Sequence, residues 1–125
     1  MTFSGTTTAT RWQPWTYRDQ SWQVTDLTGF KIEALDGDIG AVDEATHEMG
    51  SSYLIVDTGA WIFGKKVMLP AGVISRVDHQ NKRVFVDRTK DQIKNSPEFD
   101  PDDPQSYRSG EYRTRLGSYY TSTRM

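Results

Sequence analysis

Apolar residues in the middle of the chain occur in short runs and in alternation, and both patterns predict β-strands. Residues 53–56 read Tyr-Leu-Ile-Val without a polar interruption, which is typical of a strand buried on both faces. A Thr-Gly pair at 58–59 permits a turn, and a second apolar run at 67–69 ends at Pro70, which cannot donate to a ladder. We therefore expect a central strand at 53–56 and a second strand that stops near Leu69.

A hairpin is predicted upstream of these strands. Apolar and charged residues alternate over residues 30–34, and Asp36-Gly37 is a strong two-residue turn signal before a further apolar segment at 39–42. Gly40 interrupts that segment, so we expect a β-bulge there, which would help the sheet to curl.

The region that follows Pro70 predicts a second hairpin and then a short helix. Residues 73–78 and 83–87 are the strands of this hairpin, and Asn81 is the residue that best tolerates a left-handed turn position. Thr89 with Gln92 three residues later fits a capping box, which marks the start of a helix of one or two turns.

The order of these segments resembles the PRC-barrel, a small β-barrel domain. The likeness is carried by Gly-Phe-Lys-Ile at 29–32, Asp-Gly-Asp-Ile-Gly-Ala-Val at 36–42, Val-Asp-Thr-Gly at 56–59 and Trp-x-x-Gly-Lys-Lys-Val-x-Leu-Pro at 61–70. Stand-alone bacterial members are the most similar. The family also includes the cytoplasmic domain of the photosynthetic reaction-centre H subunit and the second domain of the ribosome-maturation factor RimM. The resemblance implies a fold, and it implies no activity because the family shares no catalytic residues.

We accordingly predict an all-β fold, a small PRC-type β-barrel with one short C-terminal helix and irregular, aromatic-rich terminal arms. A flexible, aromatic N-terminal arm would occupy residues 1–25, and the barrel-like domain would occupy residues 26–104 with its helix near 89–96. A Tyr/Arg-rich tail would occupy residues 105–125. A chain of 125 residues is expected to form one domain with a core of its own.

Aromatic side chains gather in both arms. Large rings are usually buried, so the N-terminal arm is expected to pack across its own barrel or to contact a second subunit or another partner. The tail could dock on an acidic barrel, stack on unpaired bases or stay disordered. A tryptophan beside Lys65-Lys66 either caps the core or joins an interface. The candidate interface residues are Trp12, Trp15, Tyr17, Trp61, Arg113, Arg115, Tyr119 and Tyr120.

Charge is distributed unevenly along the sequence, although the net charge is only −2. Residues 27–105 hold nine Lys or Arg against fourteen Asp or Glu, whereas residues 106–125 hold four Arg against one Glu. The body is therefore acidic and the tail basic. An acidic body argues against nucleic acid as the partner and leaves the tail able to bind an anionic surface.

Catalytic and metal-binding motifs are not recognisable in the sequence. The absence of cysteine excludes disulfides and thiolate chemistry. An EF-hand loop that starts at Asp36 would place Ala41 where glycine is required and His47 where the bidentate glutamate belongs. The second histidine, His79, is 32 residues away, and no nucleophile elbow, Walker loop or dinucleotide fingerprint occurs. We predict no enzyme activity, no metal site and no cofactor.

These observations predict a non-catalytic protein–protein interaction or assembly module, a scaffold that forms homo-oligomers or binds another protein. The sequence shows neither a secretion signal nor an apolar run near the ~20 residues that span a bilayer, so we expect a cytoplasmic protein without a transmembrane segment. Two alternatives stay open, both suggested by the family resemblance. One is an accessory factor of a redox or photosynthetic-type electron-transfer complex, and the other is a ribosome- or RNA-associated factor that binds through the basic tail. Sugar binding by the Trp-rich arm is a further possibility.

Overall fold

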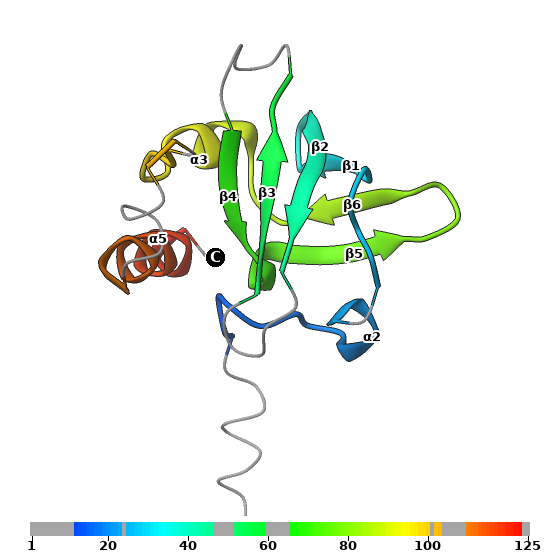
Figure 1. Cartoon of the computed structure of the whole chain (residues 1–125), viewed down its shortest axis with the longest axis horizontal. Helices are drawn as coiled ribbons and strands as arrows, with labels where there is room; N and C mark the ends of the chain where they lie inside the picture. The colour runs from blue at the N-terminus through cyan, green and yellow to red at the C-terminus, as the bar shows by residue number, and fades with distance from the viewer. Residues whose placement is uncertain are drawn as a thin grey trace, which may run out of the picture.

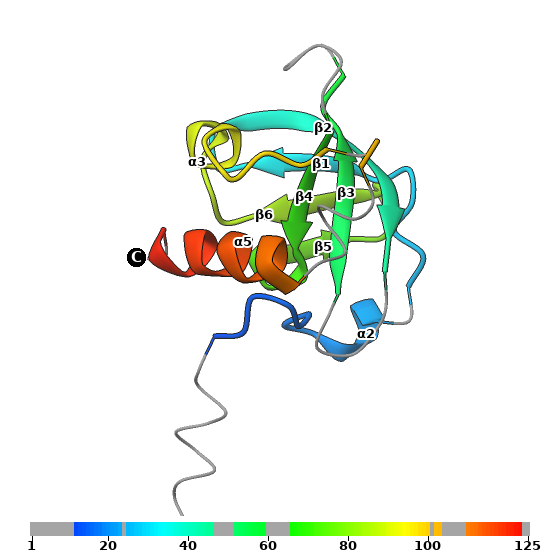
Figure 2. The same cartoon turned by 60° about the vertical axis from the view of Figure 1, so that its left-hand side comes forward.

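The fold is a six-stranded mixed sheet with helices beside it (Figures 1 and 2). The structure is a computed structural model that describes residues 12–23, 25–46, 52–59, 66–100, 102–103 and 110–123. The strands lie in the order β4-β3-β2-β1-β6-β5, and all neighbours are antiparallel except β1 and β6. The elements are α2 (Gln20–Gln23), β1 (Lys31–Ala34), β2 (Gly37–Ala45), β3 (Tyr53–Asp57), β4 (Lys66–Pro70), the 3-10 helix η1 (Ala71–Val73), β5 (Ile74–Asp78), β6 (Arg83–Val86), α3 (Lys90–Lys94) and α5 (Gly110–Ser122).

The hairpin predicted around Asp36-Gly37 is confirmed as β1 and β2, and so is its bulge. Ile32 is opposite Gly40 and Glu33 is opposite Asp38, so β2 carries one extra residue between these pairs. Gly40 has a φ of 140°, a left-handed conformation that glycine adopts without steric cost. The bulge bends β2 where it passes between β1 and β3.

The apolar run at 53–56 is confirmed as β3, an interior strand. Leu54, Ile55 and Val56 are buried, as expected for a strand that is covered on both faces. The next strand, β4, ends at Pro70 and is the first in the sheet order. Proline is tolerated there because an edge strand does not need every backbone donor.

The second predicted hairpin is confirmed as β5 and β6, but its left-handed residue is Lys82, with a φ of 54°, and not Asn81. Asn81 instead binds the Asp78 carboxylate through its backbone N–H at 3.1 Å and its side-chain Nδ2 at 2.9 Å. These two bonds fix Asn81, so the left-handed conformation is found at the following residue.

The capping box at the start of α3 is confirmed. The backbone N–H of Gln92 donates to the Thr89 hydroxyl at 3.1 Å, and the backbone N–H of Thr89 donates to the Gln92 side chain at 2.9 Å. Ile93 is fully buried and attaches this short helix to the core.

Substitution of Thr89 by alanine is expected to lower the free energy of unfolding by about 1 kcal/mol, because an N–H at the helix start loses its acceptor. Substitution by serine keeps the hydroxyl and is the matched control. Urea unfolding of both variants measures the effect. Equal losses in the two would show that the threonine methyl group, and not the cap, is what stabilises this position.

The prediction of an irregular C-terminal tail is wrong, because the tail contains the 13-residue helix α5. Tyr112, Leu116 and Tyr120 are buried, and their spacing of four residues places them on one helix face. The sequence contains this period, but two of its three members are tyrosines in a stretch rich in Arg and Ser. In both views α5 lies on the β4 side of the sheet (Figures 1 and 2).

No helix in the described parts of the chain combines the length and apolar character needed to cross a membrane.

Candidate interaction surface between the arm and the C-terminal helix

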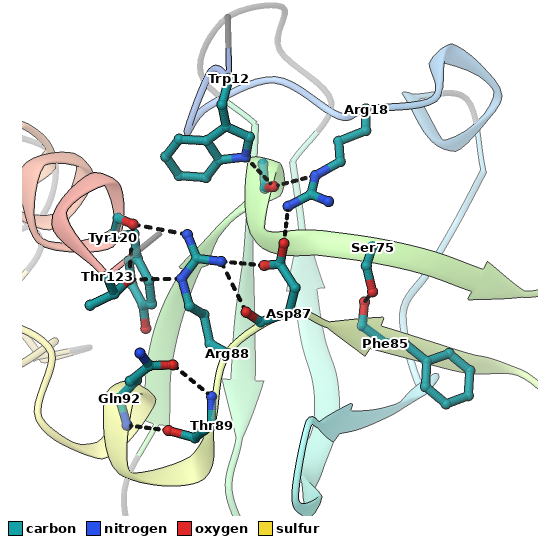
Figure 3. Close-up of polar contacts among 11 residues, drawn as sticks. Trp12, Arg18, Ser75, Phe85, Asp87, Arg88, Thr89, Gln92, Tyr120 and Thr123 are labelled. Carbon is teal, nitrogen blue, oxygen red and sulfur yellow. Dashed lines mark hydrogen bonds and ion pairs between the residues drawn. The ribbon is translucent and has the colours of Figure 1, made fainter. Parts of the chain in front are cut away.

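The N-terminal arm is attached to the corner of the sheet at Gly72, in η1 between β4 and β5. The Trp12 indole donates to the Gly72 carbonyl at 2.7 Å and the Arg18 Nε donates to the same oxygen at 2.8 Å (Figure 3). The Gly72 N–H in turn donates to the carbonyl of Pro14 at 2.8 Å. A Cβ on Gly72 would lie 2.2 Å from the carbonyl oxygen of Gln13. The arm therefore packs across its own domain, which was the first of the two alternatives considered for it.

Arg88 connects the sheet to the C-terminal helix. Its side chain is only 2% exposed, and it is the second residue after β6. The guanidinium donates to the backbone carbonyl of Tyr120 at 2.8 Å and to the Thr123 hydroxyl at 2.7 Å (Figure 3). A cation at the C-terminal end of a helix stabilises carbonyls that have no partner within the helix. Arg88 is thus a cap supplied to α5 by the sheet.

The arm also reaches Arg88, through the residue that precedes it. The Asp87 carboxylate accepts from Arg88 and from Arg18 of the arm (Figure 3). The Arg88 guanidinium lies 5.3 Å from the Trp12 ring, within range of a cation–π contact. Sheet, arm and helix therefore share one network of charged and aromatic groups.

Sequence reasoning did not identify this network. Arginine and aspartate are rarely buried, and nothing in the order Val86-Asp87-Arg88-Thr89 distinguishes these two charges from a solvated pair. The one available signal was the position of Arg88 in the sequence. It lies between the end of a strand and the N-cap Thr89, where a side chain need not follow the alternation of the strand.

Two of the residues predicted to contact a partner are core residues of this fold. Tyr17 is 4% exposed and Tyr120 is 0% exposed, so neither offers a ring to a partner. Tyr119 is half-buried, and its hydroxyl donates to the backbone carbonyl of Gln92. Trp61 lies outside the described residues.

The other predicted residues retain accessible surface. Trp12, Trp15 and Arg113 are half-buried and Arg115 is exposed. The Arg115 guanidinium lies 5.8 Å from the ring of Tyr112. Trp15 and Arg113 come from opposite ends of the chain, and the structure brings them together.

A groove of about 430 Å³ lies between the N-terminal arm and α5. We call it the arm–helix groove, and its residues include Pro14, Trp15, Arg113, Thr114, Gly117 and Ser118. Trp15 packs edge-on against Tyr53 at 6.4 Å, and the Arg113 guanidinium lies 5.4 Å from the same ring. A Cβ on Gly117 would lie 2.9 Å from the Trp15 Nε1. Glycine at this position lets the indole approach the helix closely.

Burial of tyrosines on both arms changes their acidity. It raises the pKa of Tyr17 from 10.0 to about 12, and it also raises the pKa of Tyr112 and of Tyr120. The physical cause is the loss of hydration that a phenolate would suffer inside the fold.

These shifts predict a loss of stability at alkaline pH. The contribution of Tyr17 is fully present below its unfolded pKa of 10.0 and is lost as pH rises toward about 12, because the unfolded chain releases a phenolic proton that the folded chain retains. The raised pKa values of Tyr112 and Tyr120 act in the same direction. Urea unfolding at a series of pH values measures this fall. Tyr17→Phe removes one of the groups and should make the fall less steep. Equal slopes for the two proteins would contradict the assignment to Tyr17.

Metal binding finds no support in the described ranges, where no three His, Asp or Glu side chains gather as a ligand set. His47 lies outside these ranges.

No protein-family model matches this sequence, and no curated protein sequence matches it either. The PRC-barrel resemblance therefore stays a prediction, and the functional conclusions below rest on the geometry of this chain alone.

Proposed function

We propose that this chain is a non-catalytic module that self-associates, with the arm–helix groove as its contact surface. The observation that carries the proposal is the meeting of Trp15 and Arg113 in one accessible groove. Tryptophan and arginine are the residue types most enriched at the energetic centres of protein interfaces. The basic tail and the acidic body of the same chain supply opposite charges for the two sides of such a contact.

We further propose that the sheet closes as a barrel of the PRC type. The first and last strands in the sheet order, β4 and β5, are joined directly by the three residues of η1. Register shifts at Ile32/Glu33 and at Val42/Glu44 mark two irregularities along β2, and such bulges bend strands at the corners of small barrels. Closure would also protect the backbone groups of both edge strands.

The burial of two tyrosine rings of the C-terminal tail favours self-association over RNA binding. Tyr112 and Tyr120 are enclosed by the core, so their rings are not available to stack on unpaired bases. Of the tail residues in α5, Arg113 and Arg115 keep exposed surface, and two cations are few for a phosphate backbone.

The proposal is tested by sedimentation equilibrium of the full-length chain over a wide concentration range. We expect a dimer or larger assembly that weakens when Trp15 is replaced by alanine. Leu35→Ala is the matched control, because Leu35 is a large, exposed apolar residue that is not part of the groove. A monomer at every concentration, at low as well as moderate salt, would overturn the proposal.

A further inference from the structure

Hydrogen-bond donors predominate in the arm–helix groove. The Nε of Arg113 is buried and has no hydrogen-bond partner in the described part of the chain, and its guanidinium forms no ion pair there. The indole N–H of Trp15, which lies over Gly117, likewise donates to none of the residues that the structure describes. Among the described residues, the groove is lined by no Asp or Glu side chain. It therefore suits a ligand that brings acceptors and one or two negative charges.

A carboxylate fits this groove better than a phosphate chain. Arg113 is the single cation among the lining residues that the structure describes, and one guanidinium can hold one carboxylate through two parallel N–H donors. A polyphosphate or nucleic acid needs several cations to replace its counterions. The acidic residues of the body would also repel a highly charged ligand.

The same chain displays such carboxylates on the segment that leads to α5. Asp100 and Asp102 are exposed and form no ion pair with any described residue. The Asp102 N–H donates to the Asp100 carboxylate at 3.0 Å, and this bond shapes a local turn. Phe99 is buried and lies 6.5 Å from the ring of Tyr112. The segment is therefore anchored at its base and presents its acids to solvent.

We propose that the arm–helix groove binds the acidic connector, residues 100–103, of a second copy of the chain. Arg113 would pair with Asp100 or Asp102 of that copy. The inference rests on the proposed self-association and specifies its contacts. The buried ring of Phe99 and the hydrogen bond between Asp100 and Asp102 already hold these carboxylates in place, so little conformational freedom is lost on binding.

The test is sedimentation equilibrium of the full-length chain and its variants, with circular dichroism to establish that each is folded. Arg113→Gln is expected to weaken association roughly tenfold or more, as loss of one member of an interfacial charge pair does. The double variant Asp100→Asn, Asp102→Asn changes only exposed side chains and should weaken association to a similar extent. All three changes together should cost little more than either set alone. Asp91→Asn, at an exposed position on α3, is the matched control and should leave association unchanged.

The outcomes separate this inference from the function on which it rests. An assembly that is insensitive to both sets of variants would overturn the contact and leave self-association standing. An assembly weakened by Arg113→Gln and unaffected by the aspartate variants would overturn the connector as occupant of the groove. A chain that is monomeric at every concentration would overturn both.

Discussion

Replacement of Arg88 by alanine is expected to lower the free energy of unfolding by about 3–5 kcal/mol, the range seen when one member of a buried charge network is removed. The guanidinium is 2% exposed and donates to the carbonyl of Tyr120 and the hydroxyl of Thr123. Alanine would leave this helix carbonyl with the Thr123 hydroxyl as its one remaining side-chain donor among the described residues and would open a cavity beneath Trp12. Urea unfolding followed by tryptophan fluorescence measures the loss.

Arg83→Ala is the matched control for this effect. Arg83 forms an ion pair with Glu33 at 3.0 Å, but its side chain is 40% exposed, so the loss should stay within about 1 kcal/mol. Arg88→Lys should fall between the two, because an ammonium keeps the charge and cannot match the planar fork of donors. A loss below about 1 kcal/mol for Arg88→Ala would contradict the role assigned to the network.

Arg88→Ala should destabilise α5 more than the central strands of the sheet. Arg88 caps the C-terminal end of α5 and contacts the arm, whereas β2 and β3 are paired through their own ladder. Hydrogen exchange of the α5 amides should accelerate in Arg88→Ala more than exchange of the β3 amides. Equal acceleration in both would mean that helix and sheet open only as one cooperative unit.

The strands could be predicted from the sequence because each is defined by local signals. An unbroken apolar run predicts β3, Asp36-Gly37 predicts the first hairpin, and Thr89 with Gln92 predicts the capped helix. Such signals are short in range, and they persist whatever the distant parts of the chain do.

Individual residues of the candidate groove could be predicted from the sequence, but their arrangement in space could not. Trp15 and Arg113 could be predicted as candidate interface residues, but they are 98 positions apart in the sequence, and no local pattern indicates that they meet. Their contact depends on α5, whose buried face consists largely of tyrosines. It also depends on Arg88, a charged residue that is buried because its guanidinium is hydrogen-bonded to α5. Sequence periodicity does not carry such tertiary information.

Substitution of Gly40 by alanine is the second change from which we expect a large effect. A Cβ at this position would lie 2.0 Å from the carbonyl oxygen of Asp57 and 2.9 Å from the Cα of Thr58, both backbone atoms of the neighbouring segment. The φ of 140° is also one that residues with a Cβ rarely adopt. Strain and overpacking together should lower the free energy of unfolding by about 2–5 kcal/mol.

Gly59→Ala separates the two causes. Gly59 also has a left-handed φ, 55°, but none of the described residues lies within 4 Å of the position that its Cβ would occupy. This control should therefore show the cost of a left-handed α backbone alone, about 1–2 kcal/mol, and the difference between the variants measures the close approach of β2 to the end of β3 together with the extra backbone cost at a φ of 140°. Urea unfolding of both proteins gives that difference. Equal losses would mean that the bulge at Gly40 is wide enough to hold a side chain, and that β2 does not bend there as tightly as barrel closure requires.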